Sequence, residues 1–273
     1  GIFDEQRYFD VVTEYAKADS EDILVKVTVE NRGPEEASIH LLPTFWCRNT
    51  WSWGYENGPM GDVLGRPKIR LARGAKEGIA LHADHPAEGS FWIYFEGDGE
   101  PLFTDNETNS ERLWGKANEN PYTKDAFHRY VIAGDKDAVH PQQVGSKAAV
   151  HYQAKVPAGG SRTWRVRLSR NELPAPFKRF EEVFDERKRE CEEFYHDIQS
   201  PDMDKDMRSI QRQAFAGMLC SKQLYYYDVE QWLKGDPSEP APSKGRRRVR
   251  NGDWDHLVNF DIISMPDKWE YPW

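Results

Sequence analysis

The sequence has few cysteines, no long apolar run and no excess of basic residues, and each shortage narrows the possible functions. Its three cysteines, Cys47, Cys191 and Cys220, form no CxxC pair, so we expect no disulfide framework and a reducing, cytoplasmic setting. No apolar stretch approaches the roughly 18 residues that a membrane-spanning helix needs, so we expect no membrane partner. The net charge of -9, from 37 basic and 46 acidic residues, argues against nucleic acid as the main partner.

The chain also lacks the short motifs that mark several enzyme classes. It contains no GxGxxG, P-loop, GxSxG or HExxH sequence, so nucleotide-dependent, acyl-transfer and zinc-protease chemistry have no support. We therefore expect neither a cofactor nor a metal. The first residue is Gly1 rather than Met, and no signal peptide is visible, so only a segment preceding Gly1 could carry one.

Tryptophan is abundant instead, with 10 residues in a chain that is 13% aromatic. Its side chain is costly to expose to water and suits flat ligands with one apolar side. Tryptophans gather in FWCRNTWSWGYENG (Phe45–Gly58) and in KWEYPW (Lys268–Trp273). Trp51 and Trp53 are two positions apart, the spacing of residues on one side of a strand end, and they lie beside amide and guanidinium donors such as Asn49 and Arg48. Such a setting suits a sugar, and ordinary packing between domains is the alternative.

The first part of the chain alternates apolar and polar residues with the period of a β-strand. In Asp22–Pro34, Leu24 and Lys26 face one way while Val25 and Val27 face the other, which indicates a half-buried strand. Turn residues separate at least eight such segments, so we predict an antiparallel β-sandwich rather than a parallel sheet. The expected strands lie within 7–19, 22–34, 37–48, 79–84, 91–97, 102–106, 147–157 and 161–170. The polar segment 108–130 is expected to be a short helix or an excursion over the sheet.

The pattern changes at Asn171 from period two to helical spacing. Apolar residues from Phe177 to Ile198 recur every three or four positions, which predicts an amphipathic helix of about 20 residues. A second helix is expected to start at Ser200 and to run toward LYYYDVEQWL (Leu224–Leu233). Its three consecutive tyrosines would point about 100° apart on a helix, so at least one would face a cleft or an interface.

The helical part of the sequence is too short to enclose its own apolar residues. Two helices and a polar loop cannot bury the apolar face of Met203–Leu219, which indicates that this domain is incomplete. We predict a β-sandwich domain over 1–171, a linker helix over 172–200 and a helical domain from 201 onward.

Four stretches in order resemble bacterial members of glycoside hydrolase family 63, the group of mannosyl-oligosaccharide glucosidase-like proteins. They are RYFDVVTEYAKADSEDILVKVTVENRGPE, HLLPTFWCRNTWSWG, QLYYYDVEQWLKGD and NFDIISMPDKWEYPW. The resemblance implies a supersandwich-like β-domain over 1–171 whose start is missing, followed by the linker helix and the truncated start of an (α/α)6 barrel over 201–273. It also implies hydrolysis of α-linked sugars with inversion, by an Asp general acid and a Glu general base.

The resemblance further implies that the catalytic residues lie beyond this sequence. In such relatives the stretch similar to KWEYPW leads directly into the segment with the acid, and the base follows much later. No residue of this chain therefore inherits a catalytic role, and the expected partners are an oligosaccharide or small glycoside and the remainder of the barrel in the intact chain. The expected sugar-contacting residues are Trp269, Glu270, Tyr271, Trp273, Trp51 and Trp53.

Two alternatives stay open at the level of sequence. Asp228 and Glu230 invite an acid/base hypothesis, although nothing marks them as a matched pair. The chain could also be a non-catalytic carbohydrate-binding or mutarotase-like β-sandwich protein with a helical appendix.

Overall fold

A computed structural model describes residues 3–57, 65–72, 77–238, 240–249 and 252–264. The chain divides into two compact units, the first made of residues 1–52 and 56–187 and the second of residues 53–55 and 188–273. The finer division at 171 and 200 stays a prediction. In the described residues, no helix is both long and apolar enough to cross a membrane.

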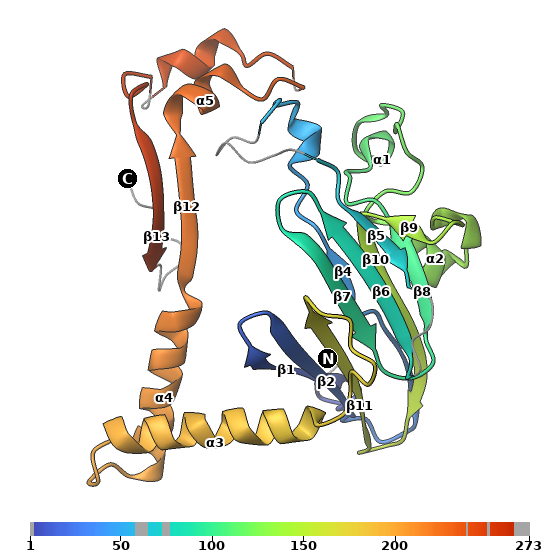
Figure 1. The fold of residues 1–273 in the computed structure, drawn as a ribbon, viewed down its shortest axis with the longest axis vertical. Coiled ribbons are helices and arrows are strands. Elements are labelled where there is room, and N and C mark those ends of the chain that lie inside the picture. The colour runs from blue at the N-terminus through green and yellow to red at the C-terminus, as the bar shows by residue number, and fades with distance from the viewer. Residues whose placement is uncertain (1–2, 58–64, 73–76, 239, 250–251, 265–273) are drawn as a thin grey trace. The chain divides into compact units, whose positions relative to one another are not determined.

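The first unit contains two antiparallel sheets, shown in Figure 1. The seven-stranded sheet has the order β1 (Phe9–Asp19), β2 (Asp22–Asn31), β11 (Ser161–Ser169), β7 (Gly89–Phe95), β6 (Ile79–His85), β5 (Lys68–Leu71) and β9 (Val144–Gly145). The four-stranded sheet contains β3 (Ala37–Leu41), β10 (Lys147–Val156), β4 (Thr44–Trp46) and β8 (Glu100–Thr104). The predicted antiparallel β-rich first part is thereby confirmed.

The main core lies between the two sheets. Leu81, Phe95 and Trp164 come from the seven-stranded sheet and pack in one cluster with Phe103 and Val150 of the four-stranded sheet. Residues next to them in sequence face the other way, because side chains alternate across a strand. The outer faces are therefore available for further layers.

The first half of strand β2 is buried on both faces, whereas its sequence predicts a strand that is buried on one face along its whole length. Val29 lies in the core between the sheets, whereas Leu24 packs on the outer face against Phe180 and Phe184. These two phenylalanines belong to the first turns of α3 (Phe180–Ile198), which confirms the helix expected up to Ile198. Alternation alone cannot reveal a helix that covers the second face of a strand.

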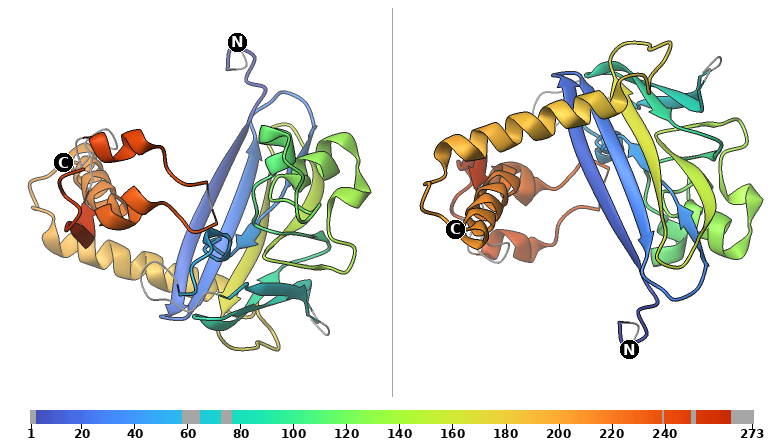
Figure 2. Two further views of the ribbon diagram at one scale, coloured as in Figure 1. Left: turned by 90° about the horizontal axis from the view of Figure 1, so that it is seen from above. Right: turned by 90° about the horizontal axis from the view of Figure 1, so that it is seen from below.

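The outer face of the four-stranded sheet is covered in part by the short helix α2 (Ala126–Ala133). The polar segment 108–130 contains α1 (Ser110–Trp114) and the start of α2, drawn in green in Figures 1 and 2. Phe127 and Tyr130 of α2 pack on Leu102 and Ala149, so this short helix closes a small core of its own.

The second unit contains the rest of α3, followed by α4 (Lys205–Cys220), β12 (Lys222–Asp228), α5 (Val229–Lys234), the 3-10 helix η3 (Lys244–Arg248) and β13 (Val258–Ser264). The consecutive tyrosines lie on strand β12, which pairs antiparallel with β13, and not on the helix that the sequence predicted. The start of α4 also differs, because Asp204 rather than Ser200 caps it, with its Oδ1 accepting from the Met207 amide at 2.8 Å.

The apolar side of α4 is left uncovered by the described residues of its own unit. None of the residues of α4 is buried, and its exposed apolar side chains are Met207, Ile210, Phe215, Met218 and Leu219. Tyr195, Val229 and Leu233 are the buried apolar residues among the described part of this unit. The expectation that this helix lacks partners within its domain is therefore confirmed for the described residues.

We expect the backbone amides of α4 to exchange with solvent faster than those of β10. The helix buries none of its residues, whereas β10 contributes Ala148, Val150 and Ala154 to the core. Deuterium uptake followed by mass spectrometry, on peptides covering 205–220 and 147–156, measures the difference. Equal protection of the two segments would contradict the lack of cover over α4.

Candidate functional site

The sequence-predicted sugar contacts divide into two groups. Trp269, Glu270, Tyr271 and Trp273 lie outside the described residues. Trp51 and Trp53 lie in a 3-10 helix, η1 (Trp51–Trp53), and not at a strand end. With about three residues per turn, side chains two positions apart point about 120° from each other, so these rings do not share one side.

Trp51 is held by the segment that follows β8. Its indole Nε1 donates to Glu107 Oε1 at 3.2 Å. Asn49 donates to the Asn106 carbonyl at 3.0 Å, and Asn106 donates to the Cys47 carbonyl at 2.9 Å. These bonds fix residues 47–52, here called the tryptophan loop, on the first unit. The Trp51 ring is half-buried and keeps part of its surface open.

Asp105 is the centre of the polar cluster beneath this loop. Its side chain is only 6% exposed, and Oδ1 accepts from the Ser146 amide and hydroxyl, each at 3.2 Å. Its Oδ2 accepts from Asn120 and pairs with Arg66 Nη2 at 2.6 Å. Arg66 also contacts Glu107 Oε1 at 3.2 Å. Because these partners fill the acceptor positions of Asp105, the carboxylate acts as a structural centre and not as a proton donor.

A second hydrogen-bond network joins two aromatic stretches within the second unit. The Tyr55 hydroxyl donates to Asp236 Oδ1 at 2.7 Å and accepts from Gln231 Nε2 at 2.8 Å, and Tyr226 donates to Gln231 Oε1 at 3.2 Å. Burial and the hydrogen bond to Asp236 raise the pKa of Tyr55. The sequence alone does not indicate a link between Tyr55, Gln231 and Asp236, since no local pattern connects position 55 to positions 231 and 236.

The acidic residues Asp228 and Glu230 have structural roles. Asp228 caps α5, with Oδ1 accepting from the Gln231 amide at 3.0 Å. Glu230 pairs with Lys234 one turn later, at 2.5 Å, and the hydrogen bond from this lysine lowers the pKa of Glu230. A general acid needs a raised pKa, so the geometry does not favour the acid/base hypothesis for this pair.

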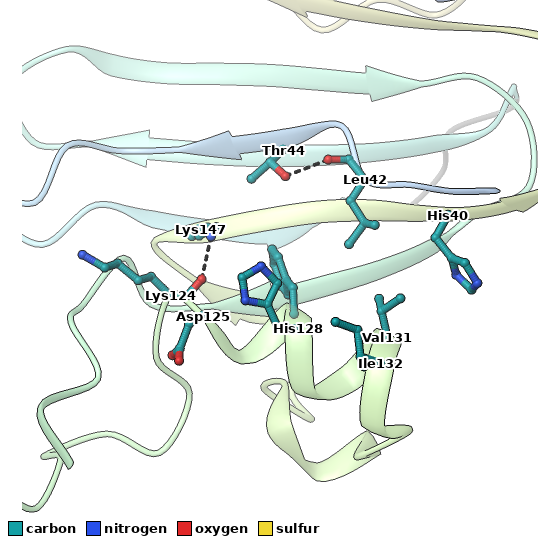
Figure 3. A pocket seen from close by; sticks show the side chains of 10 residues that line it. His40, Leu42, Thr44, Lys124, Asp125, His128, Val131, Ile132 and Lys147 are labelled. Atoms are coloured by element: carbon teal, nitrogen blue, oxygen red, sulfur yellow. Dashed lines mark hydrogen bonds between the residues drawn. The ribbon is translucent and has the colours of Figure 1, made fainter. Parts of the chain in front are cut away.

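The first unit also has a cavity that no pattern in the sequence indicates, shown in Figure 3. It has a volume of about 530 Å³ and lies between α2 and the strands β3, β4 and β10. We call it the α2 groove. Its lining residues are His40, Leu42, Thr44, Lys124, Asp125, Phe127, His128, Val131, Ile132 and Lys147. They come from separate segments of the chain, so no local motif marks them.

The part of the chain that the structure describes contains no evident metal-binding site. There, no three or more His, Cys, Asp or Glu side chains are grouped so that they could hold a metal ion. The Cys47 thiol is buried, and this burial raises its pKa to about 11, which makes it a poor ligand and nucleophile.

In sequence, the chain is similar to part of a longer protein. No protein-family model matches the chain. The uncharacterized protein YMR196W of Saccharomyces cerevisiae is 32% identical over 302 aligned positions, which cover 97% of this chain and 27% of the yeast protein. The chain thus spans about a quarter of the length of this relative.

A solved structure, provisionally named kojibiose phosphorylase from the human microbiome, is also similar. The match covers 81% of this chain and 22% of that chain, with 8% identity and a TM-score of 0.30. Similarity at this level carries no functional argument.

Replacing Asp105 with Ala is expected to lower the free energy of unfolding by about 3 kcal/mol, because Arg66 and Ser146 lose a buried acceptor. Replacing Glu107 with Ala is the matched control, with an expected loss of about 1 kcal/mol, since this carboxylate is 23% exposed and more loosely held. Urea unfolding followed by circular dichroism measures both values. Equal losses for the two variants would show that Asp105 is not the centre of the cluster.

Proposed function

We propose that this chain is part of an inverting α-glycosidase that acts on α-glucosides or related α-linked sugars. The general acid and general base would come from residues other than those described. Support comes from the four ordered stretches that resemble glycoside hydrolase family 63 and from antiparallel sheets followed by helices. The yeast relative, of which the chain spans 27%, is long enough to hold a further domain.

The exposed apolar side of α4 is the observation that carries this proposal. Met207, Ile210 and Met218 lie at helical spacing on α4, and Leu219 extends the same apolar surface. Exposed apolar area costs about 25 cal/mol per Å², so a stripe of this length is normally covered. In an (α/α)6 barrel, neighbouring helices supply that cover. The remainder of such a barrel is therefore the proposed partner of this face.

Three of the described carboxylates are already engaged, which favours an acid and a base located elsewhere. Inversion needs two carboxyl groups roughly 6.5–9.5 Å apart, with one protonated and the other free to activate water. Asp105 has its acceptor positions filled, Asp228 caps a helix, and Glu230 forms an ion pair. These residues stabilise the fold and are not free for proton transfer.

The tryptophans would contribute to sugar binding rather than to bond cleavage. The Glu107 carboxylate fixes the Trp51 indole, which leaves part of the ring open for the C–H face of a sugar. Trp53, Trp269, Glu270, Tyr271 and Trp273 complete the proposed set of contacts. A non-catalytic carbohydrate-binding protein would use the same aromatic residues, and turnover distinguishes the two functions.

A full-length protein that carries this chain is expected to hydrolyse an aryl α-glucoside and to release the β-anomer first. Proton NMR of the first-formed sugar measures this outcome.

Trp51→Ala should raise KM several-fold and leave kcat nearly unchanged. The expected rise corresponds to a loss of about 0.5–1.5 kcal/mol of stacking energy between the ring and the sugar. The control is Trp114→Ala, on the exposed helix α1. Sugar binding without turnover would support the binding protein, and release of the α-anomer would exclude inversion.

The partner of α4 can be tested with a charge on its apolar side. Ile210 is 59% exposed here, so Ile210→Glu should leave the stability of this chain alone within about 0.5 kcal/mol. In the full-length protein the same change should cost about 3 kcal/mol, because it would bury an unpaired charge. Gln213→Glu on the same helix is the matched control, and thermal unfolding is the measurement. Equal effects of Ile210→Glu in both proteins would argue against a covering domain.

A further inference from the structure

The α2 groove combines an apolar floor with a rim of hydrogen-bond donors. Leu42, Phe127 and Val131 form the floor and belong to the third core cluster or pack against it. His40, His128 and Lys147 supply ring nitrogens and an ammonium group around it (Figure 3). All lining residues belong to the first unit, so the groove is complete without the second.

Lys147 is the key group of the rim because its ammonium has spare donors. Its Nζ donates to the Lys124 carbonyl at 2.6 Å and lies 4.9 Å from the centre of the Phe127 ring. Among the described residues, no carboxylate forms an ion pair with it. An ammonium group carries three donors, so two of them remain for a ligand. Burial, and then the charge of Lys124, lower the pKa of Lys147, whereas the charge of Asp125 acts to raise it. The negative charge of a bound anion would favour the ammonium form in the same way.

Asp125 is the acidic residue of the lining, and it is already engaged. Its carboxylate accepts from Thr123 at 2.7 Å, from Arg112 at 3.0 Å and from Asn109 at 3.2 Å. Burial acts to raise the pKa of Asp125, but these hydrogen bonds outweigh it and leave the pKa below its ordinary value. In Figure 3 the carboxylate points away from Lys147, and no described ion pair joins the two, so Asp125 acts on that ammonium only through its charge at a distance.

The histidines add donors on the other side of the groove. One ring nitrogen of His40 lies 2.8 Å from His151, and its other nitrogen has no partner among the described residues. Neither ring nitrogen of His128, on the exposed side of α2, has a described partner. A neutral imidazole carries one donor and one acceptor, so both histidines can donate to a ligand, and the ammonium of Lys147 is the group of the rim that favours an anion.

We propose that the α2 groove binds an anionic monosaccharide, a sugar phosphate or a sugar acid, whose charged group accepts hydrogen bonds from Lys147 and His128. The C–H face of the sugar ring lies on the floor formed by Leu42, Phe127 and Val131. This site is separate from the tryptophan loop and does not depend on glycoside hydrolysis.

Isothermal titration of the chain with four probes tests the proposal: glucose 6-phosphate, glucuronate, inorganic phosphate and glucose. At least one of the two anionic sugars should bind with a Kd of about 1 mM or tighter, and the tighter of the two identifies the preferred charged group. Glucose and inorganic phosphate should each bind about tenfold more weakly, because each lacks one half of the contact.

Variants then locate the binding. Lys147→Met should weaken binding of the preferred anion by about tenfold or more, since a charge-assisted hydrogen bond is lost. Lys155→Met is the matched control, because Lys155 lies on the same strand, is 72% exposed and pairs with Glu36 outside the groove. His128→Ala is a second variant on the exposed side of α2, and it should weaken binding several-fold whether or not Lys147→Met folds.

Four results would overturn the proposal. If glucose binds as tightly as both anionic sugars, the charged group contributes nothing to the affinity. If inorganic phosphate binds as tightly as the anionic sugars, the apolar floor contributes nothing to the affinity. Absence of heat from both anionic sugars at about 10 mM, or unchanged affinity in both groove variants, would exclude the site.

Discussion

The buried carboxylate of Asp105 connects the two sheets of the first unit, and the position of the tryptophan loop depends on this connection. It follows β8 of the four-stranded sheet, pairs with Arg66 just before β5 of the seven-stranded sheet, and accepts from Ser146 between β9 and β10. Asn120 adds the segment that leads to α2. One side chain thus joins both sheets at the place where the tryptophan loop is anchored. A buried charge is costly unless it is paired, so the surrounding loops must keep these positions together.

The faces of the sheets explain how helices attach to this frame. Leu24 and Tyr94 look outward from the seven-stranded sheet and receive Phe180 and Phe184 of α3. Lys26 strengthens this attachment, since its Nζ lies 2.7 Å from Glu181 and 4.3 Å from the centre of the Phe184 ring. On the four-stranded sheet, Phe127 and Tyr130 of α2 pack in the same way on the outward-facing Leu102 and Ala149. The first unit is consequently closed on both sides by short amphipathic segments.

Local patterns in the sequence were sufficient for the elements whose burial alternates. Trp164, Val166 and Leu168 share a face in β11 as their spacing indicates, and α3 appears where apolar residues recur every three or four positions. Strand β12 was missed because Lys222–Asp228 follows α4 directly, with Ser221 as the sole residue between them and no glycine or proline to signal the change. The Asp105 cluster and the α2 groove could not be predicted from the sequence. Residues 66, 105 and 146, for example, come together only through the pairing of distant strands.

The contrast between Asp105 and Lys147 shows how satisfaction of polar groups separates a structural residue from a candidate ligand-binding one. Both lie near the same four-stranded sheet, and both carry a charge partly removed from water. The partners of Asp105 fill its acceptor positions, so a ligand could only compete with the fold. The ammonium of Lys147 has a single carbonyl acceptor and faces a cavity, so a ligand anion adds an interaction without displacing one. The same criterion applies to the polar cluster under the tryptophan loop, which orients Trp51 and leaves part of its ring open, the surface that we propose for sugar contact.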